Sequence, residues 1–351
     1  MTTITSHDAF DRAARPTARP WRNRLVRLAR RALIAMVVLV GVGLVYQAAG
    51  TLLDQRLYPP PGQRIDVGGY RLHLYCVGTS TADRPTVILD TLSGGTTPIW
   101  AWIQPEVAQT TQVCAYDRAG WGWSDDGPAP RDAHKTAREL HTLLARAGVD
   151  GPYVLVGHSL GGLYVRQYAA DYSDEVVGLV LIDASHPDQA AHLPAELLEM
   201  DRTMARLFPV FSALNHLGVS RLAFALGAEF DFGKLPPQQK AETKAFWSSP
   251  RRWDSLRLEA AMRPATDAQI RALGDLGNLP LAVVTAGEGS SPIWLALQAD
   301  LASLSSNSVH NVVAGATHAS LVIDPEVARV TSSAILQVVE AARTGAPLTA
   351  R

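Results

Sequence analysis

The residues best suited to covalent chemistry lie in the run VLVGHSLGGLY, residues 154 to 164. Ser159 stands between Gly157 and Gly161, with apolar β-formers before the serine and a helical pattern after it. A serine at such a strand-to-helix turn has a strained backbone that exposes its hydroxyl, and the glycines avoid collisions with the adjoining strand and helix. The helix amino terminus favours negative charge that develops there. The pattern therefore predicts a nucleophile rather than a simple glycine-rich turn.

This hydroxyl needs a base, because serine is a poor nucleophile at neutral pH. The chain has ten histidines, and His318 differs from the others because it follows the last apolar run in a loop of small residues. His158 adjoins the serine, but we expect its side chain to point away at the turn and to pack. His134 and His141 lie on an expected helix, where we expect them to be solvated. The predicted general base is therefore His318.

Strand and helix patterns alternate from residue 64 to residue 345. Apolar runs predict two strands around a Gly-Gly turn in residues 64–78, and further strands at 86–90, 111–117, 153–157, 176–183, 281–286 and 309–313. Between them, helical periodicity is clearest at residues 133–148 and 324–343. This alternation predicts a mostly parallel sheet with helices on both faces.

One segment interrupts the alternation, because residues 187–275 contain several amphipathic helical patterns and no convincing strand. In an α/β chain such an insertion predicts a helical cap over one end of the sheet, with a separate helical domain as the alternative. The core then consists of residues 64–186 and 276–345. The apolar helices of the cap favour a small hydrophobic ester or acyl substrate.

Four motifs together resemble those of the α/β-hydrolase superfamily. YDRAGWGWSD (116–125) is similar to its loop after the fourth strand, GHSLGG to its nucleophile turn, LVLIDA to its sixth strand, and ATHASLVIDPEVA to its histidine loop and last helix. The resemblance implies an eight-stranded α/β-hydrolase fold, a cap after the sixth strand and the chain order serine, acid, histidine. It implies a serine hydrolase without an organic cofactor. Epoxide hydrolases and dehalogenases of this superfamily carry an aspartate where Ser159 stands.

The resemblance also indicates the two backbone N–H groups that stabilise the tetrahedral oxyanion of ester hydrolysis. One belongs to Leu160, the residue after the nucleophile. The second belongs to the loop DTLSGGTT, residues 90–97, where alignment of the Gly-Gly pair assigns it to Ser93. The family has His-Gly before this donor, whereas Thr91 and Leu92 stand here.

The acid that orients His318 has two candidates. The family commonly places an aspartate after the seventh strand, but Ser290 occupies that position. Glu288 lies in the same loop, two positions early. Asp183 ends the sixth strand, which is an alternative position for the acid in the superfamily. We favour Asp183 over Glu288.

The amino-terminal segment differs in composition from the rest of the chain. Residues 1–31 contain eight arginines and two acidic residues, and residues 32–53 carry no charge. A span of this length can cross a bilayer as a helix, and arginines stay on the cytoplasmic side. We therefore expect a cytoplasmic basic tail (1–31), a signal anchor in the cell membrane (32–53), a proline-rich linker (54–63) and an extracytoplasmic catalytic domain. Cleavage of a signal peptide and secretion is the alternative.

Charge and cysteine content bound the remaining possibilities. The net charge of −1 argues against the broad basic face that a nucleic-acid partner requires. The sequence contains no cluster at metal-ligand spacing, so we expect no metal. Cys76 and Cys114 fall on the second and fourth strands, which are neighbours in the superfamily's sheet, so a disulfide is expected if the domain is extracytoplasmic. Two free buried thiols are the alternative.

These observations together predict a membrane-anchored serine hydrolase that cleaves an ester bond, in the manner of a carboxylesterase or lipase. The acyl group passes through Ser159, with His318 as the base. Other serine-dependent activities stay open: aminopeptidase, thioesterase, acyltransferase and cofactor-free haloperoxidase. A non-catalytic binding protein on the same fold is also possible. The sequence leaves the oligomeric state open.

Overall fold

A single eight-stranded sheet forms the centre of the molecule. The computed structural model describes residues 20–192, 194–228 and 232–349, so residues 1–19 of the expected basic tail lie outside the described part. The sheet has the order β1-β2-β4-β3-β5-β6-β7-β8. β2 runs antiparallel to both of its neighbours and all other pairs are parallel, which confirms the predicted mostly parallel sheet. The strands are β1 Gln63–Asp66, β2 Arg71–Val77, β3 Thr86–Asp90, β4 Val113–Asp117, β5 Tyr153–His158, β6 Val176–Ile182, β7 Leu281–Ala286 and β8 Ser308–Val313.

Helices cover both faces of this sheet, as expected from its apolar strands. Successive side chains of a strand point to opposite faces, so Val87 and Leu89 of β3 join one buried cluster and Ile88 joins the other. The first cluster includes residues of α2 (Ile103–Val107), α11 (Ser320–Ile323) and α12 (Pro325–Thr344), and the short 3-10 helix η1 (Thr97–Trp100). The second includes residues of α3 (Ala133–Ala147), α4 (Gly161–Asp171) and α10 (Pro292–Ser303). A further short 3-10 turn, η2 (Ser173–Glu175), leads into β6.

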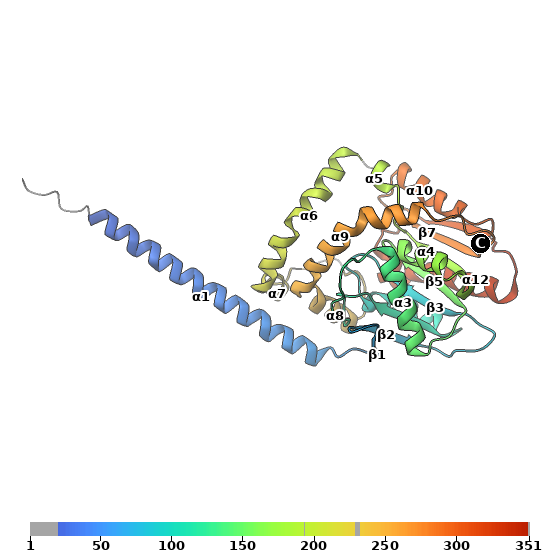
Figure 1. The fold of residues 1–351 in the computed structure, drawn as a ribbon, viewed down its shortest axis with the longest axis horizontal. Coiled ribbons are helices and arrows are strands. Elements are labelled where there is room, and N and C mark those ends of the chain that lie inside the picture. Colours follow the sequence, from blue (N-terminus) through green and yellow to red (C-terminus); the bar gives the residue numbers. More distant parts are fainter. Residues whose placement is uncertain (1–19, 193, 229–231, 350–351) are drawn as a thin grey trace, which may run out of the picture.

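The segment between β6 and β7 is helical, as expected for the predicted cap. It contains α5 (Gln189–His192), α6 (Ala195–His216), α7 (Val219–Ala225), α8 (Pro237–Trp247) and α9 (Pro250–Arg271). Figure 1 shows the two long helices α6 and α9 side by side, and Phe208 and Phe211 of α6 pack against Trp253 of α9. α9 also contacts α3 and α4, so it joins the cap to the core.

A long amino-terminal helix, α1 (Pro20–Leu57), projects from the domain in Figure 1. It contains an 18-residue stretch with a mean hydropathy of 2.2, so it is long and apolar enough to cross a membrane. The helix extends beyond the expected span 32–53 at both ends. The arginine-rich residues 20–31 are helical too, because arginine is a good helix former. The last turns continue to Leu57, where Asp54 pairs with Arg221 of α7, so the linker is shorter than the expected 54–63.

A disulfide joins the two cysteines, as one of the two alternatives predicted. Cys76 of β2 lies directly opposite Cys114 of β4 in the sheet register, and the two sulfur atoms are bonded. The bond links the antiparallel edge of the sheet to its parallel part.

Candidate active site

Ser159 occupies the turn between β5 and α4. Its backbone φ is 54°, and among the described residues only Asp183 shares a positive φ without being glycine. The neighbouring glycines are required by close packing. A Cβ on Gly157 would lie 2.6 Å from Gly162 Cα, and a Cβ on Gly161 would lie 2.6 Å from the Asp90 carbonyl oxygen. The turn therefore has the strained and tightly packed form that the sequence predicts, and it presents a partly exposed serine.

Asp183 and His318 form a close polar pair in the site. The Nδ1 atom of His318 lies 2.6 Å from Asp183 Oδ2. The other carboxylate oxygen, Oδ1, accepts the indole N–H of Trp294 at 2.8 Å and the amide of Ala286 at 3.3 Å. The Asp183 side chain is buried, whereas 42% of the His318 side chain is exposed. A carboxylate held in this way fixes the orientation of the imidazole through Nδ1 and leaves the Nε2 atom free of Asp183.

Glu288, the other candidate acid, is placed differently. It follows β7 in an exposed loop, and its backbone amide donates to the Ala316 carbonyl. Within the described chain its carboxylate makes no hydrogen bond or ion pair with His318. The structure thus brings Asp183, and not Glu288, to the imidazole.

Backbone hydrogen bonds tie the serine to the strand end that carries Asp183. The Ser159 amide donates to the Ile182 carbonyl at 3.0 Å, and the Ser185 amide donates to the Ser159 carbonyl at 2.9 Å. The serine and the acid are therefore fixed relative to each other by bonds on both sides of Asp183. No hydrogen bond joins the Ser159 hydroxyl to His318 in the part of the chain that the structure describes. Such contacts are often loose without a substrate.

His158 has a larger role than the packing expected from the sequence. Its side chain is buried, and its Nε2 atom lies 3.1 Å from the His318 carbonyl oxygen, to which it donates. The two imidazole rings lie 4.6 Å apart. Burial, reinforced by the neighbouring His318, lowers the pKa of His158 well below its ordinary value. A neutral His158 thus supports the loop that carries His318.

The two expected oxyanion donors belong to the serine turn and to the loop after β3. Leu160 precedes the first residue of α4, and its amide donates to no other described residue. The loop after β3 contacts the turn, because Gly161 packs against the carbonyls of Asp90 and Thr91. In this loop the backbone amides of Leu92 and Ser93 donate no hydrogen bond to any described residue. Ser93 thus stays a prediction, with the adjacent Leu92 amide as a second candidate.

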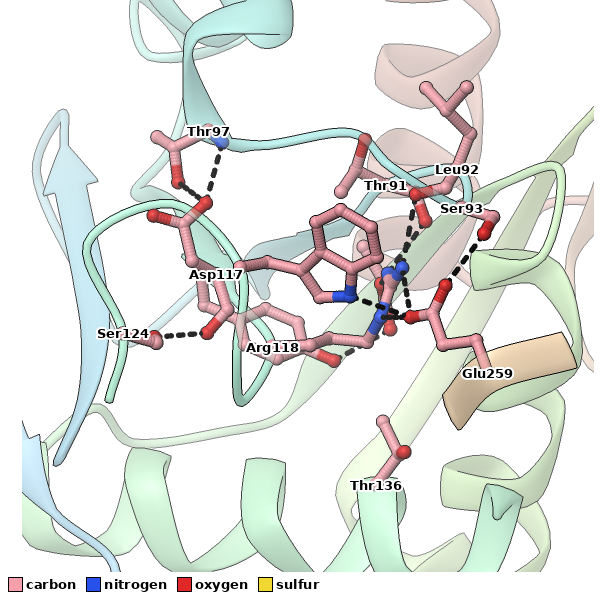
Figure 2. Close-up of polar contacts among 12 residues, drawn as sticks. Thr91, Leu92, Ser93, Thr97, Asp117, Arg118, Ser124, Thr136 and Glu259 are labelled. Atoms are coloured by element: carbon pink, nitrogen blue, oxygen red, sulfur yellow. Dashed lines mark hydrogen bonds and ion pairs between the residues drawn. The ribbon is translucent and has the colours of Figure 1, made fainter. Parts of the chain in front are cut away.

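The loop that carries these amides is held by a buried cation (Figure 2). Arg118, directly after β4, donates to the carbonyls of Thr91 at 2.7 Å and Leu92 at 3.0 Å. The same guanidinium lies 2.5 Å from Asp90 Oδ1 and 3.0 Å from Glu259 Oε1. Burial alone would lower the pKa of Arg118, but Glu259 and Asp90 outweigh this effect and raise it well above its ordinary value. Arg118 therefore stays charged inside the protein.

Glu259 of α9 links the cap to this loop. Besides Arg118, it accepts the Ser93 hydroxyl at 2.6 Å and the Trp121 indole N–H at 2.8 Å. Arg118 was not predicted from the sequence, although it lies in the quoted motif YDRAGWGWSD. Glu259 was not predicted either, because it lies 141 residues further along the chain with no local signal.

An apolar pocket opens beside the loop and the histidine. Its volume is about 170 Å³, and both core and cap contribute to it. The lining residues include Leu92, Ile99, Phe232, Leu235, Trp247 and Ala319, the residue after His318. An apolar cavity of about 150 Å³ holds benzene, so this pocket has room for a group of that size.

Comparisons with known proteins agree with the fold. The family model of the alpha/beta hydrolase fold matches residues 87–272. An uncharacterized protein of Schizosaccharomyces pombe (strain 972 / ATCC 24843) is 28% identical over 294 residues, which cover 74% of this chain and 52% of that protein. The chain thus spans about half the length of this relative.

Two solved structures have the same architecture. The epoxide hydrolase CorEH matches with a TM-score of 0.60 and 19% identity, over 77% of this chain and 96% of that one. A thermophilic esterase from Thermogutta terrifontis, with malate bound, matches with a TM-score of 0.59 and 23% identity, over 80% of this chain and 100% of that one. At these identities the likeness concerns the fold alone.

Proposed function

Because the chain belongs to the alpha/beta hydrolase fold family, we propose that it is a serine hydrolase that cleaves an ester bond. One observation carries the proposal: Ser159, at a φ of 54°, is bonded to the strand end that carries Asp183, and Asp183 holds His318. Epoxide hydrolases of this fold carry an aspartate nucleophile at the position where this chain has Ser159. The site therefore favours acyl transfer over epoxide opening.

The proposed reaction begins at the serine hydroxyl. Ser159 Oγ attacks the ester carbonyl while His318 Nε2 accepts its proton. Asp183 keeps the proton on Nδ1 and stabilises the imidazolium that forms. His318 then gives its proton to the leaving alcohol, which departs and leaves an acyl-enzyme on Ser159.

The second half of the reaction uses the same groups. A water molecule gives a proton to His318 and attacks the acyl-enzyme, and the acid product leaves as Ser159 regains its proton. In both halves the carbonyl oxygen carries negative charge in the tetrahedral state. The amides of Leu160 and Ser93 are the proposed donors to it, beside the amino terminus of α4.

The substrate proposed for this site is an ester with a small hydrophobic acyl group. The apolar pocket of about 170 Å³ next to the oxyanion loop supports this size class. Aminopeptidase, thioesterase, acyltransferase and haloperoxidase activities use the same serine chemistry and are the competing activities. No organic cofactor or metal enters the proposed reaction.

We further propose that α1 anchors the enzyme in the cell membrane, with the arginine-rich end in the cytoplasm and the catalytic domain outside. The composition of α1 supports the anchor, since arginines flank membrane spans on the cytoplasmic side. The disulfide between Cys76 and Cys114 supports the topology, because such bonds persist in oxidising compartments.

The test has two parts, each on its own sample of the full chain. One part is covalent labelling with a fluorophosphonate probe, and the other is hydrolysis of esters of increasing acyl length by the unlabelled protein. We expect the wild type and a surface control, Ser173→Ala, to be labelled, and Ser159→Ala to lose both labelling and hydrolysis. No labelling of the wild type would favour a non-catalytic binding protein. Labelling that persists in Ser159→Ala would show that another residue is the nucleophile.

A further inference from the structure

The second half of α1, from Gly43 onward, is packed against the cap. Gly43 lies so close to α6 that a Cβ there would be 2.9 Å from the Leu217 carbonyl oxygen, and a Cβ on Gly50 would be 2.4 Å from the Arg221 side chain. Gln47, a polar residue within the uncharged segment, is buried and donates to the Ser248 carbonyl at 3.1 Å. Gly43 and Gly50 thus face the corner where α6 meets α7, which we call the α6–α7 corner (residues 203–228). Gln47 faces it as well, because Arg221 Nε donates to Gln47 Oε1 at 3.4 Å.

The length of α1 places this corner at the level of the membrane. From Arg31, the last arginine of the basic cluster, to Gly43 there are 12 residues, or about 18 Å of helix. The hydrocarbon layer is about 30 Å thick. A span that starts after Arg31 therefore extends past Gly43 by roughly another 12 Å, alongside the α6–α7 corner. Any tilt of the helix makes this overlap longer.

The α6–α7 corner carries large apolar side chains that no other part of the described structure covers. Leu226 is 79% exposed and Leu222 is 51% exposed, one helical turn apart. Other apolar side chains along α6 and at the start of α7 are exposed by about two fifths or more: Met204, Leu207, Val210, Leu214 and Val219. Exposed apolar surfaces of this extent mark interaction sites.

The charges of the corner fit a hydrocarbon neighbour as well. Residues 203–228 contain two arginines and no acidic residue. Arg221 pairs with Asp54 of α1 at 2.6 Å, and only about a fifth or less of each side chain is exposed. Arg206 is exposed, and a side chain of this length can reach the headgroup level from a buried backbone.

We propose that the α6–α7 corner inserts into the leaflet of the lipid bilayer that faces the catalytic domain, beside α1. The inference rests on the proposed anchoring of α1. The bilayer then covers one continuous apolar surface, made of the outer side of α1 and the exposed side chains of the corner. The cap is thereby a membrane-contacting element, and the anchor is not its sole contact with lipid.

Site-directed spin labelling of the full chain in phosphatidylcholine vesicles tests this. Both native cysteines are in the disulfide, so a cysteine introduced at Leu226, Leu222, Val38 or Ser80 is the single free thiol. Val38 reports on the anchor, and the exposed Ser80 precedes β3, at the end of the sheet opposite the cap. Collisions with oxygen report hydrocarbon, and collisions with a nickel chelate report water. We expect the oxygen-to-nickel ratio at Leu226→Cys and Val38→Cys to be several times that at Ser80→Cys.

The four labels separate failure of this inference from failure of the anchor. A lipid-like ratio at Val38→Cys with a water-like ratio at both Leu222→Cys and Leu226→Cys would overturn the inference and leave the anchor intact. A water-like ratio at Val38→Cys would overturn the anchor itself. Labels on the corner that are shielded from both reagents would show a protein partner, such as a second copy, and would also overturn the inference.

Discussion

The cap meets its surroundings in opposite ways on its two sides. Toward the core, α9 contributes Glu259 to a buried set of charges with Arg118 and Asp90. Away from the core, beside its contact with α1, the α6–α7 corner exposes Leu222, Leu226 and further apolar side chains. The buried side of the cap therefore carries charges, although buried positions are usually apolar. The exposed side carries apolar side chains, although exposed positions are usually charged or polar.

The difference concerns direction as much as polarity. Hydrogen-bonded charges fix positions, because each guanidinium N–H must meet one particular acceptor. Apolar contacts are non-directional, so they tolerate sliding. The charged side thus sets the position of the loop after β3 through the carbonyls of Thr91 and Leu92, whereas the proposed lipid contact on the apolar side tolerates a fluid neighbour.

The largest effect on the charged, directional side is expected at the buried carboxylate behind the histidine. Asp183→Asn keeps the shape but favours the wrong tautomer of His318, and we expect kcat to fall by about 10⁴-fold, as this change does in a serine protease with a Ser-His-Asp triad. Steady-state kinetics on the best ester of the panel measures it. Glu288→Gln is the matched control and should keep activity near the wild-type value. The reverse result would assign the acid to Glu288.

Removal of the buried cation should cost stability. Arg118→Met leaves Asp90 and Glu259 buried together without their counter-charge, so we expect the free energy of unfolding to fall by about 3 to 5 kcal/mol. Urea unfolding measures it. Arg329→Met removes a solvent-exposed arginine that pairs with Glu326, and should cost about 1 kcal/mol or less. Equal losses in the two variants would contradict the role given to the buried set.

The burial of His158 leads us to expect that the free energy of unfolding depends on pH, with an effect of intermediate size. Its pKa is lowered in the folded state, so below the ordinary pKa of about 6.5 the unfolded state binds a proton that the folded state does not. Stability then falls as the pH falls, by up to about 1.4 kcal/mol per unit. His158→Asn keeps an N–H donor but cannot titrate.

Urea unfolding at several pH values between about 7 and 5, where the ordinary histidine pKa lies, compares the two proteins. We expect a shallower fall in His158→Asn than in the wild type. His310, whose pKa is also lowered by burial, is retained in both proteins and contributes equally to both. Parallel curves would show that His158 is not held neutral.

The smallest effect is expected on the apolar side. Leu226→Ser changes a side chain that is 79% exposed, so the free energy of unfolding in mild detergent should change by only about 0.5 kcal/mol or less. Leu143→Ala in α3, fully buried, is the contrast and should cost about 2 to 5 kcal/mol. A large loss for Leu226→Ser would indicate that this side is packed against protein.

The two sides also differ in how far the sequence predicts them. The nucleophile turn is local, since Ser159 and its glycines lie within five residues, and the disulfide partners lie on strands whose order the superfamily resemblance supplies. The position of Asp183 at a strand end was enough to favour it as the acid. Glu259 is different, because it reaches Arg118 only through the packing of α9 on the core, and no periodicity reports that contact.

The contacts of α1 were beyond prediction for a related reason. Hydropathy describes the composition of a segment, but not which of its sides meets the protein. Gln47 reads as a single polar residue in an apolar run, and only its bond to the Ser248 carbonyl shows that it faces the cap. The role of His158 is similar, because its partner is a backbone carbonyl 160 residues away.

The glycines at positions 43 and 50 have a consequence for anyone who engineers this protein. They let the helix pack directly on the cap, so the sequence of the helix is matched to the surface of this particular cap. A generic hydrophobic span of equal length would keep the proposed anchor, but a bulky side chain in place of Gly43 would collide with the Leu217 backbone and push the helix off the cap. α1 is therefore part of the tertiary structure as well as an apolar segment. Exchanging it is closer to a core mutation than to the replacement of a flexible tether.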